Sequence, residues 1–384
     1  MHLLMVIRSL DIGGAERQCR VLSVALASKG HTVTLCTLGS GGALAPGLPD
    51  AGVSHVSLGH RGPRDLLRSC QRLRTLVKSL RPAVIYSFLP VSNVVCALSI
   101  PRGFRARLVW GIRSAEIDRA AVGFFAGSSF FVERMLSHIP SLIIVNSEAG
   151  RRFHAALGFD ERVLRVVENV IDTATFLYDV EIRREHRRTN QVGEAVRVVV
   201  ILARVDRLKG YDTFLEAAAQ IAAKRADVEF WSVGGGGRQA RDEMQRRADT
   251  LGLGEKLKWH GEIRNARAVA GLLMASDVGV SASISEGFPN AVAECLACGL
   301  RVVGTDVGDT RRIIGTSGEC VPVGDPVAMS EAVLRQLELD VPREDSRADF
   351  LARFEPGILL DRHEELLSTI AEQSRQQDSG SPHQ

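Results

Sequence analysis

The sequence lacks any apolar run of the roughly 18 residues that a membrane-spanning helix requires. Its first residues, MHLLMVIRSL, become polar too early for a signal peptide and carry no cleavage pattern, so we interpret them as a first strand. Cysteine is scarce as well: the seven cysteines are scattered and odd in number, which disfavours a disulfide framework and favours a reducing compartment. These absences predict a cytoplasmic protein.

Several motifs of metal and nucleotide chemistry are also absent. No D-x-D pair occurs in the 384 residues, which disfavours a divalent-ion site, so we expect no metal and no cofactor. Neither the dinucleotide pattern G-x-G-x-x-G nor a Walker A loop is present. Aromatic residues make up only 5% of the chain, and basic charge alone does not make a nucleic-acid site, so we expect no nucleic-acid partner.

Charge is distributed unevenly around a small net value of +3. The first 165 residues carry 21 Lys and Arg against 10 Asp and Glu, whereas the remainder carries 27 against 35. A basic first half is suited to nucleic acid, to a phosphorylated substrate or to the anionic inner face of a membrane. Because 42 of the 48 basic residues are arginine, an arginine-rich composition explains the asymmetry equally well.

The sequence does contain short apolar runs that alternate with helix-length amphipathic segments, and this series occurs twice. Apolar strands without polar alternation, each followed by a helix, are typical of a parallel sheet covered on both faces. The predicted strands lie within residues 2–10, 32–38, 54–58, 83–89, 106–112, 141–147, 196–205, 227–235, 256–261, 277–283, 301–306 and 319–324. We therefore predict an α/β protein with two Rossmann-like, doubly wound domains that face a central cleft.

The predicted boundaries follow from where polar, unpatterned segments interrupt this series. They are residues 1–168 for an N-terminal domain, 169–195 for a polar linker, 196–352 for a C-terminal domain, 353–373 for a last helix that crosses back to the first domain, and 374–384 for a disordered tail.

Two strand-to-helix loops are suited to phosphate. In SLDIGGAERQ, Gly13 and Gly14 allow the backbone to approach a ligand beside a helix N-terminus, which favours an anion. In LARVDRLKGYDTF, Arg204 follows the strand and Lys209 precedes a helix, and an arginine fork with a lysine point charge suits a diphosphate. Each loop alone has a simpler interpretation, since two glycines often only turn the chain and an isolated R-x4-K is more often an exposed basic turn.

The stretch SASISEGFPNAVAECLACGLRVV places two acids eight residues apart. Pro289 suits the first turn of a helix and Asn290 is a good cap, so Glu286 precedes the helix and Glu294 lies about one turn inside it. Carboxylates accept hydrogen bonds from pairs of hydroxyls, so the two acids can hold two sugars on either side of a phosphate. Alternatively, Glu294 only favours the positive end of the helix dipole, or the two form a hydrolase pair, which needs an acidic cleft.

Together these motifs resemble the signature of retaining glycosyltransferase family 4, which has the GT-B fold. The resemblance covers about residues 1–370 and depends on the E-x7-E block with R-x4-K about eighty residues upstream. It implies that the first domain takes the acceptor and the second binds the donor, a UDP- or GDP-linked sugar that is a substrate and not a cofactor. The implied donor-binding residues are Gly13, Gly14, Arg204, Lys209, Gly287, Phe288, Pro289, Asn290 and Glu294.

The resemblance also implies a role for individual residues. Glu286 would contact hydroxyls of the donor hexose, Glu294 would hold the nucleotide ribose, and Arg204 with Lys209 would hold the diphosphate. Many relatives carry a histidine after the strand in LVWGIRSAE, where this chain has Arg113. The implied catalytic residues are Glu286, Arg204, Lys209 and Arg113.

The function implied by the resemblance is metal-independent, retaining transfer of a hexose to the hydroxyl of a glycan or lipid-linked acceptor, in bacterial cell-surface polysaccharide, lipopolysaccharide or glycolipid synthesis. The paired aromatics of residues 119–138 and the basic first half favour peripheral contact with the inner membrane surface, although an ordinary buried helix explains the aromatics equally well. The alternatives are a GT-B epimerase or phosphorylase, and a non-catalytic partner subunit that binds nucleotide sugar.

Overall fold

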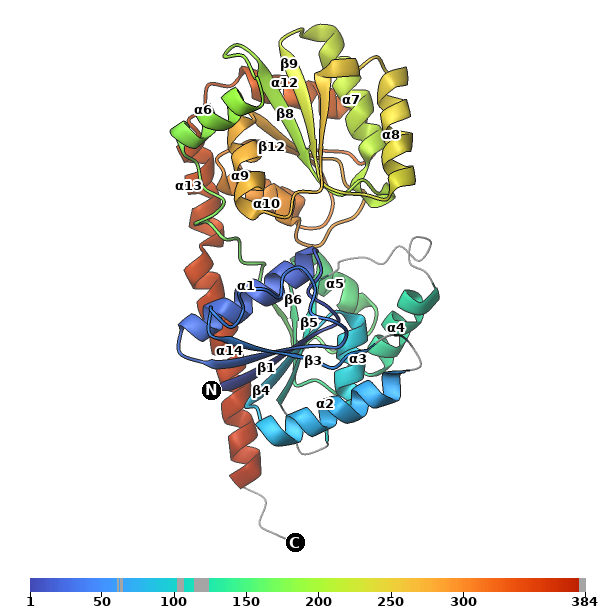
Figure 1. Cartoon of the computed structure of the whole chain (residues 1–384), viewed down its shortest axis with the longest axis vertical. Helices are drawn as coiled ribbons and strands as arrows, with labels where there is room; N and C mark the ends of the chain where they lie inside the picture. Colours follow the sequence, from blue (N-terminus) through green and yellow to red (C-terminus); the bar gives the residue numbers. More distant parts are fainter. Residues whose placement is uncertain (61, 63–64, 102–106, 114–123, 380–384) are drawn as a thin grey trace. The chain divides into compact units, whose positions relative to one another are not determined.

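The computed structural model describes residues 1–60, 62, 65–101, 107–113 and 124–379. Contacts divide the chain into two compact units: unit 1 is Met1–Val170 with Gly357–Gln384, and unit 2 is Ile171–Pro356. Each unit is a parallel sheet with helices packed on its faces (Figure 1). The predicted α/β class and doubly wound architecture are therefore confirmed for each unit.

Unit 1 contains a seven-stranded parallel sheet in the order β3-β2-β1-β4-β5-β6-β7. Its strands are β1 (His2–Ile7), β2 (Thr32–Thr37), β3 (Val53–Ser57), β4 (Val84–Phe88), β5 (Leu108–Ile112), β6 (Leu142–Val145) and β7 (Leu164–Val166). Its helices are α1 (Gly14–Ser28), α2 (Leu66–Leu80), α3 (Pro90–Ser99), α4 (Phe124–Met135), α5 (Glu148–Ala156) and α14 (Pro356–Ser379). Alternate residues of β1, Leu4 and Val6, pack with Leu73 and Val77 of α2, so the amphipathic helix covers one sheet face.

Unit 2 contains a six-stranded parallel sheet in the order β10-β9-β8-β11-β12-β13. Its strands are β8 (Arg197–Leu202), β9 (Val228–Val233), β10 (Leu257–Gly261), β11 (Val278–Ser281), β12 (Arg301–Thr305) and β13 (Gly318–Val321). Its helices are α6 (Val180–Thr189), α7 (Tyr211–Lys224), α8 (Arg238–Thr250), α9 (Ala266–Ala275), α10 (Asn290–Ala297), α11 (Thr310–Ile314), α12 (Pro326–Glu338) and α13 (Arg343–Phe354), with short 3-10 turns at η3 (Arg207–Lys209) and η4 (Gly254–Lys256).

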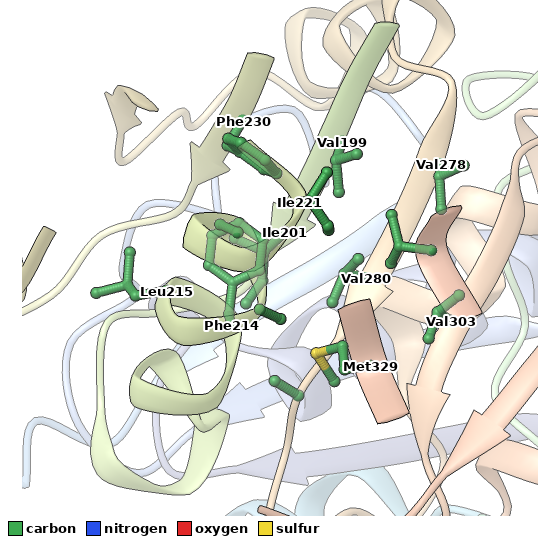
Figure 2. Close-up of a cluster of buried hydrophobic side chains, with 14 of the residues drawn as sticks. Val199, Ile201, Phe214, Leu215, Ile221, Phe230, Val278, Val280, Val303 and Met329 are labelled. Atoms are coloured by element: carbon green, nitrogen blue, oxygen red, sulfur yellow. The ribbon is translucent and has the colours of Figure 1, made fainter. Parts of the chain in front are cut away.

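The core of unit 2 lies between its sheet and two helices. Phe214 of α7 and Met329 of α12 are buried against strand residues such as Val199 and Val280 (Figure 2). Burial of this branched and aromatic set supplies the hydrophobic stabilisation of the sheet on that face.

The twelve predicted strands all form, but the sequence did not predict β7. This strand has three residues, Leu164–Val166, at the edge of the sheet, with an exposed arginine between two apolar residues. So short a run falls below the length at which apolar periodicity can be recognised.

The segment predicted as a polar linker contains helix α6. Asp179 caps it by accepting hydrogen bonds from the backbone N–H groups of Glu181 and Ile182. Arg183 donates to the carbonyl oxygens of Met274 and Ser276 at the end of α9 and forms an ion pair of 2.7 Å with Asp277. Because arginine side chains and not an apolar stripe attach α6 to unit 2, the hydrophobic pattern did not reveal it.

The last helix is longer than predicted, since α14 runs from Pro356 to Ser379. Residues 374–379, predicted as disordered, belong to it, and Ser374 accepts a hydrogen bond of 2.6 Å from Arg107 of unit 1. Glu364 accepts from Lys29 at 2.7 Å and pairs with His31 at 2.9 Å, so polar contacts attach the helix to its unit. The remaining tail prediction, residues 380–384, lies outside the described residues. Among the described helices, none has the length and apolar character to cross a membrane.

Candidate functional site

Two loops of unit 2 lie side by side because their strands are neighbours. The loop after β8 carries Lys209 and the loop after β11 carries Glu286, and β8 pairs with β11. The backbone N–H of Ile284 donates to the carbonyl of Leu208 at 2.8 Å, which joins the two loops directly. Gly210 has φ +62°, and a Cβ there would lie 1.9 Å from the carbonyl oxygen of Ala282. Only glycine permits this approach.

The joined loops bring two of the predicted site residues into contact. Lys209 Nζ lies 2.5 Å from Glu286 Oε1, and the Ser283 hydroxyl donates to the same oxygen at 2.7 Å. The two charged side chains are 24% and 16% exposed. Both contacts use Oε1, so among the described residues Glu286 Oε2 remains available to a hydroxyl donor.

Helix α10 begins beside this pair. Its N-cap residue is Pro289, which makes no side-chain capping bond, and Asn290, predicted as the cap, is instead the first helical residue. The Phe288 side chain is buried against Phe354, with the two ring centres 5.9 Å apart. Gly287 is held by its carbonyl, which accepts from Asp309 N–H at 3.0 Å. The first-turn amides and the dipole of α10 therefore favour an anion beside Lys209.

The other two predicted donor contacts of unit 2 differ in environment. Glu294 is only 7% exposed and lies one turn inside α10, as the spacing predicted. Arg204 is mostly exposed, with 74% of its side chain accessible, and pairs with Asp206 at 2.9 Å. The structure thus places Lys209 and Glu286 together, while Arg204 contacts neither of them.

In unit 1 the first glycine loop leads into α1. Gly13 is the N-cap residue in extended conformation, and Gly14 is the first helical residue. The Glu16 carboxylate folds back over this turn. Its Oε2 lies so close to Gly13 that a Cβ on that residue would be only 2.2 Å away. An anion that binds these amides therefore meets an acidic side chain that the sequence analysis did not single out.

Arg113 lies at the carboxyl end of β5 in unit 1. It donates to Asn169 Oδ1 at 3.0 Å and to the Tyr86 hydroxyl at 3.0 Å, and its guanidinium carbon lies 5.1 Å from the centre of the Phe88 ring. Sequence reasoning did not single out Tyr86 or Asn169 as site residues. The sheet order could have indicated Tyr86, because β4 and β5 are neighbours and their ends meet at one edge.

Gln18 is another residue that sequence reasoning missed. Its side-chain amide donates to the carbonyl of Val170 at 2.7 Å and accepts from the Val170 N–H at 2.9 Å. Gln18 therefore holds the backbone of Val170, where the chain leaves unit 1 for unit 2. The side chain is buried, and it sits one turn beyond the glycine loop.

No group of His, Cys, Asp and Glu suited to a metal ion occurs within the described parts of the chain. Cys295 and Cys298, which form a C-x-x-C in α10, are free thiols that are fully buried, and burial raises the pKa of both. Their surroundings are those of packing residues, and Cys295 lies against Gly279 of β11.

Two family models match the chain over most of its length. The model described as Glycosyltransferase Family 4 matches residues 12–175, and the model described as Glycosyl transferases group 1 matches residues 196–338. The chain belongs to glycosyltransferase family 4. The resemblance seen in its motifs is therefore confirmed.

Relatives within this family differ in how much of the chain they match. A phosphatidyl-myo-inositol mannosyltransferase of Mycobacterium leprae is 30% identical over 182 residues, 46% of this chain and 47% of the relative. A D-inositol 3-phosphate glycosyltransferase of Geodermatophilus obscurus is 30% identical over 219 residues, 54% of this chain and 48% of the relative. The matches thus span about half the length of these curated relatives.

Solved structures share the fold over nearly the whole chain. The crystal structure of Anabaena HepE in complex with UDP has a TM-score of 0.81 and 20% identity, covering 96% of this chain and 100% of that chain. A sucrose-phosphate synthase from Thermosynechococcus elongatus has a TM-score of 0.80 and 19% identity, covering 99% and 100%. These likenesses confirm the GT-B fold predicted for this family.

Proposed function

We propose that the protein is a retaining, metal-independent glycosyltransferase that moves a hexose from a nucleotide sugar to an acceptor hydroxyl. The relatives act on phosphatidyl-myo-inositol or D-inositol 3-phosphate according to their names, and Anabaena HepE binds UDP. We extend the same reaction class to this chain, with a glycan or lipid-linked acceptor of bacterial cell-surface polysaccharide, lipopolysaccharide or glycolipid synthesis.

The observation that carries this proposal is the Lys209–Glu286–Ser283 cluster beside the start of α10. A carboxylate with one oxygen held by Lys209 and Ser283 has its other oxygen available to accept from hexose hydroxyls. Lys209 and the first-turn amides of α10 supply the positive charge and the N–H donors that a diphosphate needs, which supports the proposal. A sugar and a phosphate can therefore be bound within one loop pair.

In the proposed reaction the donor's anomeric C–O bond breaks and its electron pair stays on the phosphate oxygen. Lys209, Arg204, Arg113 and the α10 amides stabilise the charge that develops there. The acceptor oxygen forms its bond to the anomeric carbon on the same face, and the acceptor proton passes to the departing phosphate. Glu286 orients the hexose, Glu294 holds the ribose, and the backbone at Gly13, Gly14 and Gly287 contacts the donor.

Glu286→Ala tests this proposal. We expect hexose transfer to fall about 100- to 1000-fold because a contact to the reacting sugar is lost, with an unchanged thermal unfolding midpoint. Glu216→Ala is the matched control, since Glu216 is a surface carboxylate of unit 2 that pairs with Arg247. Near-normal transfer by the Glu286 variant would exclude the assignment.

Donor and reaction type are separated by two further measurements. A panel of UDP- and GDP-sugars, tested by thermal shift, should identify the base, because a ligand that binds only the folded chain raises its unfolding temperature. Incubation with that donor then distinguishes sugar transfer from epimerisation or from phosphorolysis with inorganic phosphate. Binding without any turnover would instead favour a non-catalytic subunit.

We also propose peripheral contact with an anionic membrane surface, through α2. This helix contains no acidic residue, and its exposed face carries Arg68, Arg74 and Lys78 beside Leu67, whose exposed fraction is 78%. Each cation near an anionic surface contributes about 1 kcal/mol of binding free energy. The region predicted earlier, residues 119–138, lies partly outside the described residues.

Sedimentation with vesicles that contain an anionic lipid tests this contact. The variant Arg68→Gln/Arg74→Gln/Lys78→Gln should lose binding, whereas Arg238→Gln/Arg241→Gln/Arg246→Gln on exposed α8 removes the same charge and should retain it. Binding that both variants lose equally would indicate a general effect of net charge, and no binding by the unmodified chain would exclude the contact.

A further inference from the structure

Arg113 is held by neutral groups at the carboxyl edge of the unit 1 sheet. Its Nη1 donates to Asn169 Oδ1 and its Nη2 to the Tyr86 hydroxyl, both at 3.0 Å. The Nε–H is buried and has no hydrogen-bond partner among the described residues. The two contacts and the Phe88 ring together restrict the position of the guanidinium plane.

Among the described residues, Arg113 has no counter-ion. Across the described ranges, no Asp or Glu oxygen lies within 4.0 Å of its guanidinium, whereas Arg183, Arg187 and Arg343 all reach Asp277. A half-buried cation without a counter-ion is costly to hold. Such an arrangement is favoured where the counter-ion arrives with a ligand.

The titratable groups that interact with Arg113 also stay neutral. Burial raises the pKa of Cys19 on α1 and of Tyr86 on β4 to about 12. Burial, with the nearby Arg113 charge, lowers the pKa of His363 on α14 to about 3. None of the three gains a charge near neutral pH, so none of them acts as a counter-ion to Arg113.

We propose that Tyr86 and Asn169 are positioning residues that hold Arg113 as an uncompensated cation for one phosphate-class oxyanion of the transfer reaction. This inference rests on the proposed function, because the oxyanion belongs either to the donor diphosphate or to a phosphate group on the acceptor. Arg113 provides two further N–H donors, one on each Nη, and a planar guanidinium matches two phosphate oxygens at once.

Asn169→Asp tests the charge while keeping the shape of the side chain. The new carboxylate would face Arg113 at the distance of the present 3.0 Å hydrogen bond and would neutralise it. If Asn169 only supports the fold, this ion pair leaves ligand binding unchanged. If the uncompensated charge is the function, affinity for the oxyanion falls about 10- to 100-fold while the chain stays folded.

The measurement is calorimetric titration of the full chain with UDP, GDP and glycerol 3-phosphate. We expect Asn169→Asp and Arg113→Gln to weaken either nucleotide binding, which assigns the donor diphosphate, or glycerol 3-phosphate binding, which assigns an acceptor phosphate. Arg107→Gln is the control, because Arg107 precedes the same strand β5 and contacts Ser374 and Pro82 at its other end. It removes one positive charge and should change each Kd less than twofold.

Tyr86→Phe provides a second route should Asn169→Asp fold poorly, because it removes one anchor and adds no charge. We expect it to weaken the same ligand about three- to tenfold. Unchanged affinities in both variants, or an equal loss in Arg107→Gln, would overturn the inference. Failure of the proposed function is distinct, since the unmodified chain would then bind neither UDP nor GDP.

Discussion

The carboxyl edges of the two sheets treat charge in opposite ways. In unit 2, Lys209 is paired with Glu286 and Arg204 with Asp206. In unit 1, Arg113 has only neutral partners, and the buried carboxyl group of Glu133 has no Lys or Arg within 4.0 Å among the described residues. Among the described residues, these edges thus carry paired cations in unit 2, and a cation and a carboxyl group without charged partners in unit 1.

The difference has a physical consequence for ligands. A cation that is paired with a carboxylate costs the fold little free energy, because the carboxylate offsets its desolvation. An incoming phosphate must, however, compete with that carboxylate. An isolated cation lowers the stability of the fold, yet it meets a phosphate without displacing anything. We infer that donor binding in unit 2 involves an exchange of partners, whereas binding at Arg113 does not.

The largest effect on stability and transfer is expected when the two joined loops of unit 2 are forced apart. Gly210→Ala places a Cβ 1.9 Å from the Ala282 carbonyl oxygen at φ +62°. We expect unit 2 to lose about 2–4 kcal/mol of unfolding free energy, because strain and overpacking act together. The loops should move apart, Lys209 should lose Glu286, and transfer should fall below detection.

Urea unfolding and a transfer assay check this prediction. Gly193→Ala is the control, because that glycine is not in the left-handed region and its nearest contact would be an ordinary 3.5 Å to Val196. A Gly210 variant as stable as this control would show that the two loops can separate without strain.

Much of this fold could be predicted from the sequence, because buried parallel strands appear as apolar runs. Helix α6 and strand β7 could not. The first is attached through Arg183 and Arg187 to carbonyl oxygens, and the second has only three residues. Both depend on tertiary contacts that no local pattern records.

The site shows the same division. The spacing of Glu286 and Glu294 around the start of α10 follows from local helix rules. The Lys209–Glu286 contact joins residues 77 positions apart and exists because β8 and β11 are neighbours in the sheet. Likewise, Tyr86 and Asn169 meet Arg113 only once the strand order is known, so sequence reasoning could predict the residue but not its partners.

The next largest expected effect is on the pH dependence of stability, and it comes from Glu133, the buried carboxyl group of unit 1. Glu133 is buried on α4 and accepts a hydrogen bond of 2.6 Å from Asn93, and burial raises its pKa from 4.5 to about 7. Below pH 4.5 both folded and unfolded chains hold the proton. Between pH 4.5 and 7 only the unfolded chain ionises, so stability falls as the pH rises through this window.

Glu133→Gln removes this titration while keeping an oxygen that accepts from Asn93. We expect the variant to be more stable than the unmodified chain by about 2–3 kcal/mol at pH 8, and the difference to be much smaller near pH 4.5. Urea unfolding of both chains at the two pH values measures it. A difference that is the same at both would show that Glu133 ionises normally in the folded chain.

The smallest expected effect comes from a substitution that removes the counter-ion of Lys209 and so makes the charge at the unit 2 edge resemble that at the unit 1 edge. Glu286→Gln keeps an oxygen for Lys209 and Ser283 but removes the counter-ion, so Lys209 becomes an isolated cation like Arg113. We expect the variant to bind UDP two- to fivefold more tightly, about the coupling of a partly exposed ion pair, although hexose transfer falls. Calorimetry with UDP measures the change. Weaker UDP binding would mean that Lys209 needs the carboxylate to hold its position, and then pairing in unit 2 serves geometry in the way that Tyr86 and Asn169 serve it in unit 1.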